Sequence, residues 1–172
     1  QVSLGLLAFV FSKFPKGSKN MSSVLCIIDM QYPFLGPGDE VYVAAVVEAV
    51  IQARSLGKHI VLVEDRAGHP SDGAIKAALE GYLHQSRVSK GQWDGSLPIA
   101  IDLQTRGIRP SAIRACGAFA EQCVFATLTG LREEFPWAEI EVLRQACVPA
   151  PTGRFNDAAW QRLCSKYRIT LN

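Results

Sequence analysis

The apolar residues of the chain fall into short continuous runs, separated by longer stretches in which apolar positions recur at helical spacing. Residues 24–28 form one run that ends at Asp29, and residues 59–63 form another that ends at Glu64. Continuous runs of this length are typical of strands buried on both faces of a parallel sheet. The segment between them, residues 39–56, has a helical pattern, so the sequence predicts a β-α-β unit.

The alternation of the two patterns continues to the C-terminus. Further strands are expected at residues 85–88, 112–116, 139–143, 146–148 and 168–171, and further helices at residues 72–83, 97–105, 121–134 and 156–167. Strands that alternate with helices favour right-handed crossovers between parallel strands. The predicted fold is therefore α/β: a three-layer α/β/α sandwich around a mainly parallel, Rossmann-like sheet.

The chain divides at its first strand. Its 172 residues suit one well-buried core, so we expect a single domain over residues 21–172. Residues 2–11 form an apolar run that lysines follow, whereas a secretory signal carries its charges in front, and the run is too short to cross a bilayer. Residues 1–20 are interpreted as an N-terminal arm or an upstream extension, and no membrane association is expected.

Charge and cysteine content narrow the class of protein. The 18 basic and 16 acidic residues are scattered and give a formal net charge of +2, which argues against a nucleic-acid partner. The five cysteines are irregularly spaced and form no CxxC pair, which argues against a disulfide framework or a zinc site. We expect a reduced, cytoplasmic protein in which Cys26, Cys116 and Cys147 are buried apolar side chains.

Three reactive side chains are expected at the carboxyl edge of the sheet. Asp29 follows the first strand, Lys90 the third and Cys123 the fourth. In open α/β sheets ligands bind at this edge, near the point where the strand order reverses, so the three side chains are expected to meet in one cleft. A helix N-terminus favours a thiolate at Cys123, and burial next to a thiol would raise the pKa of Asp29.

Each of these residues also has an ordinary structural interpretation. Cys123 could be a packed residue in the first turn of a helix, Asp29 the cap of the next turn, and Lys90 a solvated loop cation. Taken singly, the residues do not decide between the two interpretations.

Three motifs together resemble those of the isochorismatase-like cysteine hydrolases, a superfamily that includes nicotinamidases, carbamoylsarcosine amidases and isochorismatases. Asp29-Met30-Gln31, followed by Phe34, resembles the first-strand signature of that family, and residues 89–93 resemble its lysine loop. Residues 117–127 resemble the segment that carries the nucleophile. Order and approximate spacing agree over residues 23–171.

The resemblance implies hydrolysis of an amide or carbamoyl C–N bond in a small molecule. Asp29 would take the proton of Cys123, and the thiolate would attack a carbonyl carbon to give a thioester. The backbone N–H of Cys123 and one near Phe119 would form the oxyanion hole, next to a cis peptide bond expected at Ala118–Phe119. Aromatic candidates for the substrate pocket, which could equally be core residues, are Tyr32, Phe34 and Trp93.

The resemblance is incomplete around the metal site of the nicotinamidases. Those enzymes carry an Asp-x-His and a further His, a spacing that residues 64–69 lack. Asp65 and His69 could still bind a metal, or they could be a turn-forming Asp and a surface His. We expect no metal and no other cofactor. The family also tends to have Thr-Asp where this chain has Ala120-Glu121, which leaves the natural substrate open.

Two other functions fit the same residues. Isochorismatases cleave a vinyl ether, and in some of them the cysteine is dispensable, so replacing Cys123 with alanine would separate the two reactions. The altered residues around the triad also fit a binding domain that keeps the fold without turnover. Because family members commonly form dimers or larger assemblies, a homo-oligomer is expected.

Overall fold

The apolar runs form the strands of one sheet. The computed structural model describes residues 21–151 and 157–172. Six strands lie in the order β3-β2-β1-β4-β5-β6, and every neighbouring pair is parallel. The strands are β1 (Met21–Ile28), β2 (His59–Asp65), β3 (Gln85–Lys90), β4 (Arg109–Ala118), β5 (Glu139–Val148) and β6 (Ile169–Leu171).

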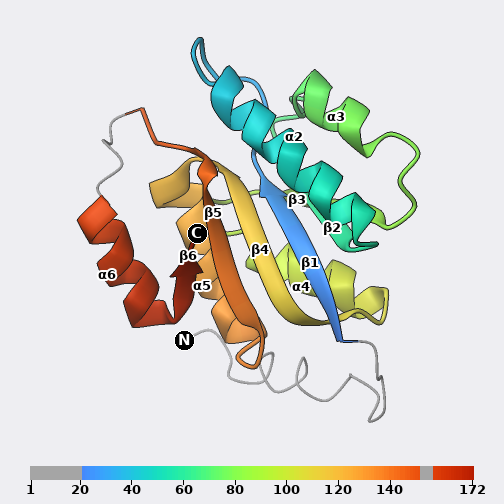
Figure 1. The fold of residues 1–172 in the computed structure, drawn as a ribbon, viewed down its shortest axis with the longest axis vertical. Coiled ribbons are helices and arrows are strands. Elements are labelled where there is room, and N and C mark those ends of the chain that lie inside the picture. The colour runs from blue at the N-terminus through green and yellow to red at the C-terminus, as the bar shows by residue number, and fades with distance from the viewer. Residues whose placement is uncertain (1–20, 152–156) are drawn as a thin grey trace.

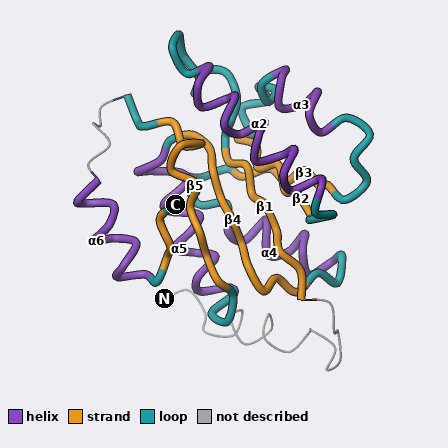
Figure 2. The backbone as a smooth tube through the Cα atoms, in the orientation of Figure 1, coloured by secondary structure: helices purple, strands orange, loops and turns teal. Residues whose placement is uncertain are grey.

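Helices cover both faces of this sheet. They are α2 (Glu40–Ser55), α3 (Gly73–Leu79), α4 (Ser96–Thr105), α5 (Phe125–Glu134) and α6 (Asp157–Tyr167), and a π-helical turn, η1 (Ala120–Val124), precedes α5. Figure 1 shows α2 and α3 in front of the sheet and α4 and α5 behind it. Figure 2 shows the strands between these two helical layers. The predicted three-layer α/β/α sandwich with a parallel sheet is confirmed.

The strand order reverses between β1 and β4. From β1 the chain moves outward to β2 and β3, and it then crosses back to β4 on the other side of β1 (Figure 1). The two central strands pair as far as Ile28 and Gly117, after which α2 follows β1 on one face while η1 and α5 follow β4 on the other. In open α/β sheets, ligands bind outside the carboxyl ends of the strands at the point where the strand order reverses.

Four predicted elements differ from the structure. The helix expected over residues 72–83 ends at Leu79, because Glu80 is extended and Gly81 has a positive φ of 69°. The strands expected at 139–143 and 146–148 are one strand, β5, whose register against β4 shifts between Ala115 and Gly117. The helix expected from residue 121 begins as the π-turn η1. The proposed arm, residues 1–20, lies outside the described residues.

Burial follows the predicted pattern. Cys26, Cys116 and Cys147 are free and buried, as predicted. In residues 21–151 and 157–172 no helix has both the length and the apolar character that a membrane span requires.

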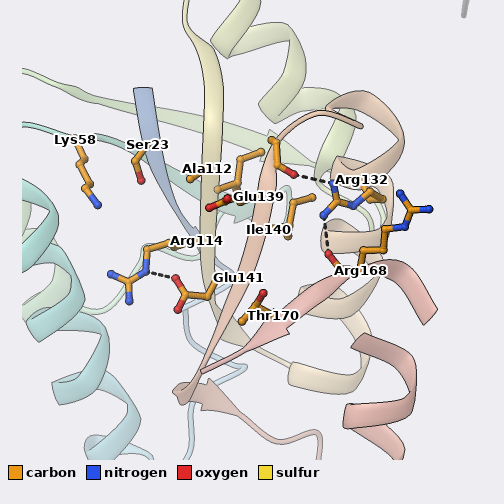
Figure 3. Close-up of a pocket in the computed structure, with 12 residues that line it drawn as sticks. Ser23, Lys58, Ala112, Arg114, Arg132, Glu139, Ile140, Glu141, Arg168 and Thr170 are labelled. Atoms are coloured by element: carbon orange, nitrogen blue, oxygen red, sulfur yellow. Dashed lines mark hydrogen bonds and ion pairs between the residues drawn. The ribbon is translucent and has the colours of Figure 1, made fainter. Parts of the chain in front are cut away.

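The amino-terminal end of the sheet carries an open polar cavity of about 640 Å³ (Figure 3). Two arginines that line this cavity hold neighbouring strands and loops together. The Arg114 Nε lies 2.7 Å from Glu141 Oε2, which joins β4 to β5. Among the described residues, Arg132 donates to the backbone carbonyl groups of Pro136, Ala138, Tyr167 and Arg168. Ser23, Lys58 and Glu139 of its lining lie at or near the starts of their strands, so the cavity is at the opposite end of the sheet from the carboxyl edge.

Candidate active site

The structure brings the Asp29 and Lys90 side chains into contact at the carboxyl edge of the sheet. Asp29 directly follows β1 with a positive φ of 52°, and its N–H donates to the Val63 carbonyl of β2. Lys90 is the last residue of β3, and its Nζ lies 2.7 Å from Asp29 Oδ2. Lys90 therefore reaches across the end of β2 to the carboxylate.

This ion pair is removed from solvent. The side chains of Lys90 and Asp29 are 2% and 1% exposed, and Lys90 Nζ also donates to the Gln92 carbonyl at 2.9 Å. A buried charge is costly unless it is paired, so the two groups stabilise each other's charged form. The interpretation of Lys90 as a solvated loop cation is wrong. Apart from its contacts with Lys90 and Cys123, the Asp29 carboxylate has no hydrogen-bond partner in the described part of the chain.

Cys123 is the third member of the group. It is the fourth residue of η1 and is 7% exposed, and its thiol hydrogen-bonds with the Asp29 carboxyl group. Lys90 is close enough for its charge to act on the same sulfur, and the Phe119 backbone N–H also interacts with it. The three side chains that were predicted to meet in one cleft therefore do lie together.

Burial determines the protonation of Cys123. Desolvation, and after it the charge and hydrogen bond of Asp29, raise the pKa of the Cys123 thiol to about 11, against the opposing effects of Lys90 and the Phe119 N–H. A helix N-terminus was expected to favour a thiolate, and that expectation is wrong for the resting site because desolvation outweighs it. At neutral pH the resting sulfur is a thiol, so a neighbouring base is required before it can attack.

Asp29 has the properties of such a base. Burial raises the pKa of its carboxyl group, while the hydrogen bond and charge of Lys90 and the hydrogen bond to Cys123 lower it. The predicted upward shift is confirmed. A carboxylate with a raised pKa binds a proton more strongly than an exposed one does, which suits it to take a proton from a neighbouring thiol and to return it later.

The turn before Cys123 has an irregular backbone. The Ala118–Phe119 peptide bond is cis, at the position predicted. The Phe119 carbonyl accepts from the N–H groups of Gln122 and Val124 at 3.1 and 3.2 Å, which closes the turn that carries the sulfur. The role of this turn as an oxyanion hole remains a prediction.

The three aromatic candidates occupy different positions. Phe34 packs edge-on against Phe119 at 5.7 Å between ring centroids, so it lies beside the cysteine turn. Tyr32 is 70% exposed with its ring against His69, and Trp93 is 64% exposed. Their part in a substrate pocket remains a prediction.

Two buried polar residues support the site, and sequence reasoning did not assign them this role. Gln31 accepts from the Asp65 N–H at 2.7 Å and donates to the His69 carbonyl, which fixes the loop after β2 beside Asp29. Thr127 of α5 accepts from the Gly95 N–H at 2.9 Å, which fixes the end of the lysine loop. The sequence signal was their place inside the family-like motifs.

Asp65 and His69, the two residues considered as metal ligands, make other contacts. Asp65 Oδ1 accepts from the Ala67 N–H at 2.8 Å, as a turn-forming Asp does, and His69 packs on Tyr32. Within residues 21–151 and 157–172, no three His, Cys, Asp or Glu side chains gather in a way that could hold a metal ion. These contacts fit the turn-forming interpretation of Asp65.

Comparison with known proteins agrees with this geometry at the level of the fold. No protein-family model and no curated protein matches the chain. Among solved structures, an isochorismatase family protein from Desulfovibrio vulgaris superposes with a TM-score of 0.65 at 19% identity, over 88% of this chain and 94% of that one. The chain has the isochorismatase-like fold.

Two amidases share this isochorismatase-like fold with the chain. N-carbamoylsarcosine amidase from Thermoplasma acidophilum has a TM-score of 0.71 at 17% identity, over 88% of this chain and 96% of that one. The nicotinamidase SaPncA from Staphylococcus aureus has a TM-score of 0.69 at 14% identity, over 89% of this chain and 100% of that one. At these identities the likeness defines the fold, and the reaction has to be argued from the site.

Proposed function

We propose that this protein is a cysteine hydrolase that cleaves the C–N bond of an amide or carbamoyl group in a small molecule. The observation that carries the proposal is the buried Asp29–Lys90 pair, 2.7 Å apart, with the Cys123 thiol against the same carboxyl group. Two proteins with this fold are by name amidases, which supports the choice of bond. The combination supplies a nucleophile, its base and a fixed positive charge.

The first half of the reaction transfers the acyl group to sulfur. Asp29 takes the proton of Cys123, and the sulfur attacks the substrate carbonyl carbon to give a tetrahedral oxyanion. The oxyanion collapses as the C–N bond breaks, and Asp29 returns its proton to the departing nitrogen. The products of this half are a Cys123 thioester and ammonia or an amine.

The second half uses the same groups with water as the nucleophile. Asp29, now ionised again, takes a proton from water, and the resulting hydroxide attacks the thioester carbon. The C–S bond breaks, the sulfur recovers the proton from Asp29, and the carboxylic acid product leaves. Asp29 thus acts as a base in each attack and as an acid in each departure.

Lys90 and the cysteine turn stabilise charge during these steps. Lys90 lowers the pKa of both Asp29 and Cys123, which favours the ionised form of each group in turn. The backbone N–H of Cys123 and one near Phe119 are the candidates for holding the oxyanion, and donors of this kind contribute roughly 3 kcal/mol each to transition-state stabilisation.

Ammonia release from a panel of small amides, ureas and carbamoyl compounds tests the proposal. We expect turnover of at least one class by the wild-type protein, loss of turnover in Cys123→Ala, and full activity in the control Cys164→Ala, which removes a buried thiol from α6. Vinyl-ether cleavage that survives in Cys123→Ala would instead support the isochorismatase reaction. Ligand binding without turnover in the wild-type protein would support a binding domain.

A further inference from the structure

The π-turn that carries Cys123 is tied to the segment after β5 by one side chain. Glu121 is the second residue of η1, and its Oε2 accepts from the Ala150 N–H at 2.9 Å across 29 residues of sequence. The last register pair of β4 and β5 is Ala118 with Val148. Glu121 therefore links the two segments beyond the point where the ladder ends.

Ala150 has a specific need for this acceptor. It is 4% exposed and lies between Pro149 and Pro151, neither of which has a backbone N–H. Its N–H is the one main-chain donor of that three-residue segment, and a buried donor without an acceptor would cost stability. The carboxylate of Glu121 satisfies it.

The second oxygen of Glu121 shows that this carboxylate is more than a surface charge. Oε1 is buried and has no hydrogen-bond partner in the described residues. The charges that shift the pKa of Cys123 are those of Asp29 and Lys90, whereas the charge of Glu121 acts on the thiol of Cys147. The link between Glu121 and the nucleophile is therefore geometric.

We propose that Glu121 is a positioning residue, which fixes the Cys123 sulfur and backbone N–H by clamping η1 to Ala150; this rests on the proposed hydrolase function. Two contacts hold this region. Just before η1, the Ala118–Val148 register pair joins β4 to β5, and within η1 the Glu121–Ala150 hydrogen bond joins the turn to the segment after β5. In the sequence, Phe119, whose carbonyl closes the turn, lies between these two contacts. Loss of the Glu121–Ala150 hydrogen bond lets the sulfur move relative to Asp29 and the Phe119 N–H.

The test compares two replacements of similar size. Glu121→Gln keeps a carbonyl oxygen that can accept from Ala150, and Glu121→Leu has no acceptor. We expect Glu121→Leu to lower kcat by about tenfold or more with KM within about twofold, because a small misplacement of reacting atoms is enough for such a loss. Glu121→Gln should restore most of kcat. Glu133→Leu, on exposed surface of α5, is the matched control and should change neither constant.

A second measurement does not depend on turnover. The rate of Cys123 alkylation by iodoacetamide, followed by mass spectrometry, should rise in Glu121→Leu, because a released turn frees the sulfur from burial and from Asp29, the two larger causes of its raised pKa, and should return toward the wild-type rate in Glu121→Gln. A rate in Glu121→Leu equal to or below that of wild type would overturn the clamp, as would an equal gain in the Gln and Leu variants. Failure of the hydrolase proposal would appear in the wild-type protein as absent turnover, while alkylation would still decide the role of Glu121.

Discussion

A β-carbon built on Gly117 would lie 1.9 Å from the carbonyl oxygen of Ile28. The central strands β4 and β1 thus come into contact at their carboxyl ends, one residue before Asp29 on one strand and one residue before the cis peptide on the other. Gly117 also has a φ of 138°, a conformation that L side chains rarely adopt. The spacing of the candidate site across these two strands depends on this glycine.

Gly117→Ala should therefore destabilise the protein severely. The new methyl group meets backbone atoms, which cannot rotate away, and we expect a loss of about 3 kcal/mol or more in the free energy of unfolding. Urea denaturation checks this. The matched control is Gly57→Ala, also at positive φ but with nothing within 4 Å of the added carbon, where about 1 kcal/mol is expected. Equal losses in the two variants would show that the close approach to Ile28 is unimportant.

Lys90→Met should destabilise the protein in a pH-dependent way. Removing the ammonium group leaves the Asp29 carboxylate buried without a counter-charge, at a cost of about 3 kcal/mol when that carboxylate is ionised. Without Lys90 the already raised pKa of folded Asp29 rises further, so the folded variant binds a proton more tightly than the unfolded chain does. Its stability is then greatest at low pH and declines as pH rises through the folded pKa.

Urea denaturation of wild type and Lys90→Met at pH 5 and pH 8 measures this effect, and we expect the larger difference between them at pH 8. Lys76→Met, which removes an exposed lysine from α3, should show no such pH dependence. A penalty for Lys90→Met that is the same at both pH values would contradict the assigned ion pair.

Asp29→Asn should separate the reactivity of the thiol from catalysis. The charge and hydrogen bond of Asp29 raise the pKa of Cys123, so their removal, with Lys90 left in place, should bring the midpoint of its alkylation below about pH 11. Hydrolysis should nevertheless fall by about 10²–10⁴-fold, because the proton acceptor is gone. Alkylation measured from pH 6 to 11 and amide turnover measured in parallel give the two values. An unchanged midpoint, or turnover at the wild-type rate, would be inconsistent with Asp29 as the base.

The fold was predictable from the sequence because the central strands β1 and β2 contain continuous apolar runs and segments of helical pattern separate the strands that follow. The convergence of Asp29, Lys90 and Cys123 followed from one general rule about the carboxyl edge of parallel sheets. The protonation of Cys123 was not predictable in the same way. It depends on the balance between desolvation and the charges of Asp29 and Lys90, and that balance is a property of three-dimensional burial, which strand order alone does not specify.

The hydrogen bonds that support the site could not be predicted from the sequence for a related reason. Glu121 and Ala150 are 29 residues apart, and their contact depends on how two loops run after their strands end. The apolar periodicity of the sequence predicts the strands and helices, but it does not predict the path of the loops beyond them. A π-turn in place of a regular helix start is a similar case, since one extra residue in a turn leaves no apolar pattern.

Thr127→Val should weaken the lysine loop without changing the size of the side chain. The Thr127 hydroxyl accepts the Gly95 N–H at 2.9 Å, and valine would leave that buried donor without a partner, at a cost of about 1–3 kcal/mol. Thr127→Ser keeps the hydroxyl and should retain the hydrogen bond. The control Thr129→Val removes a hydroxyl that, in the described part of the chain, donates to carbonyls of its own helix, and it should cost less. Thermal denaturation of the four proteins checks the order, and a valine variant as stable as wild type would show that the loop is held by other contacts.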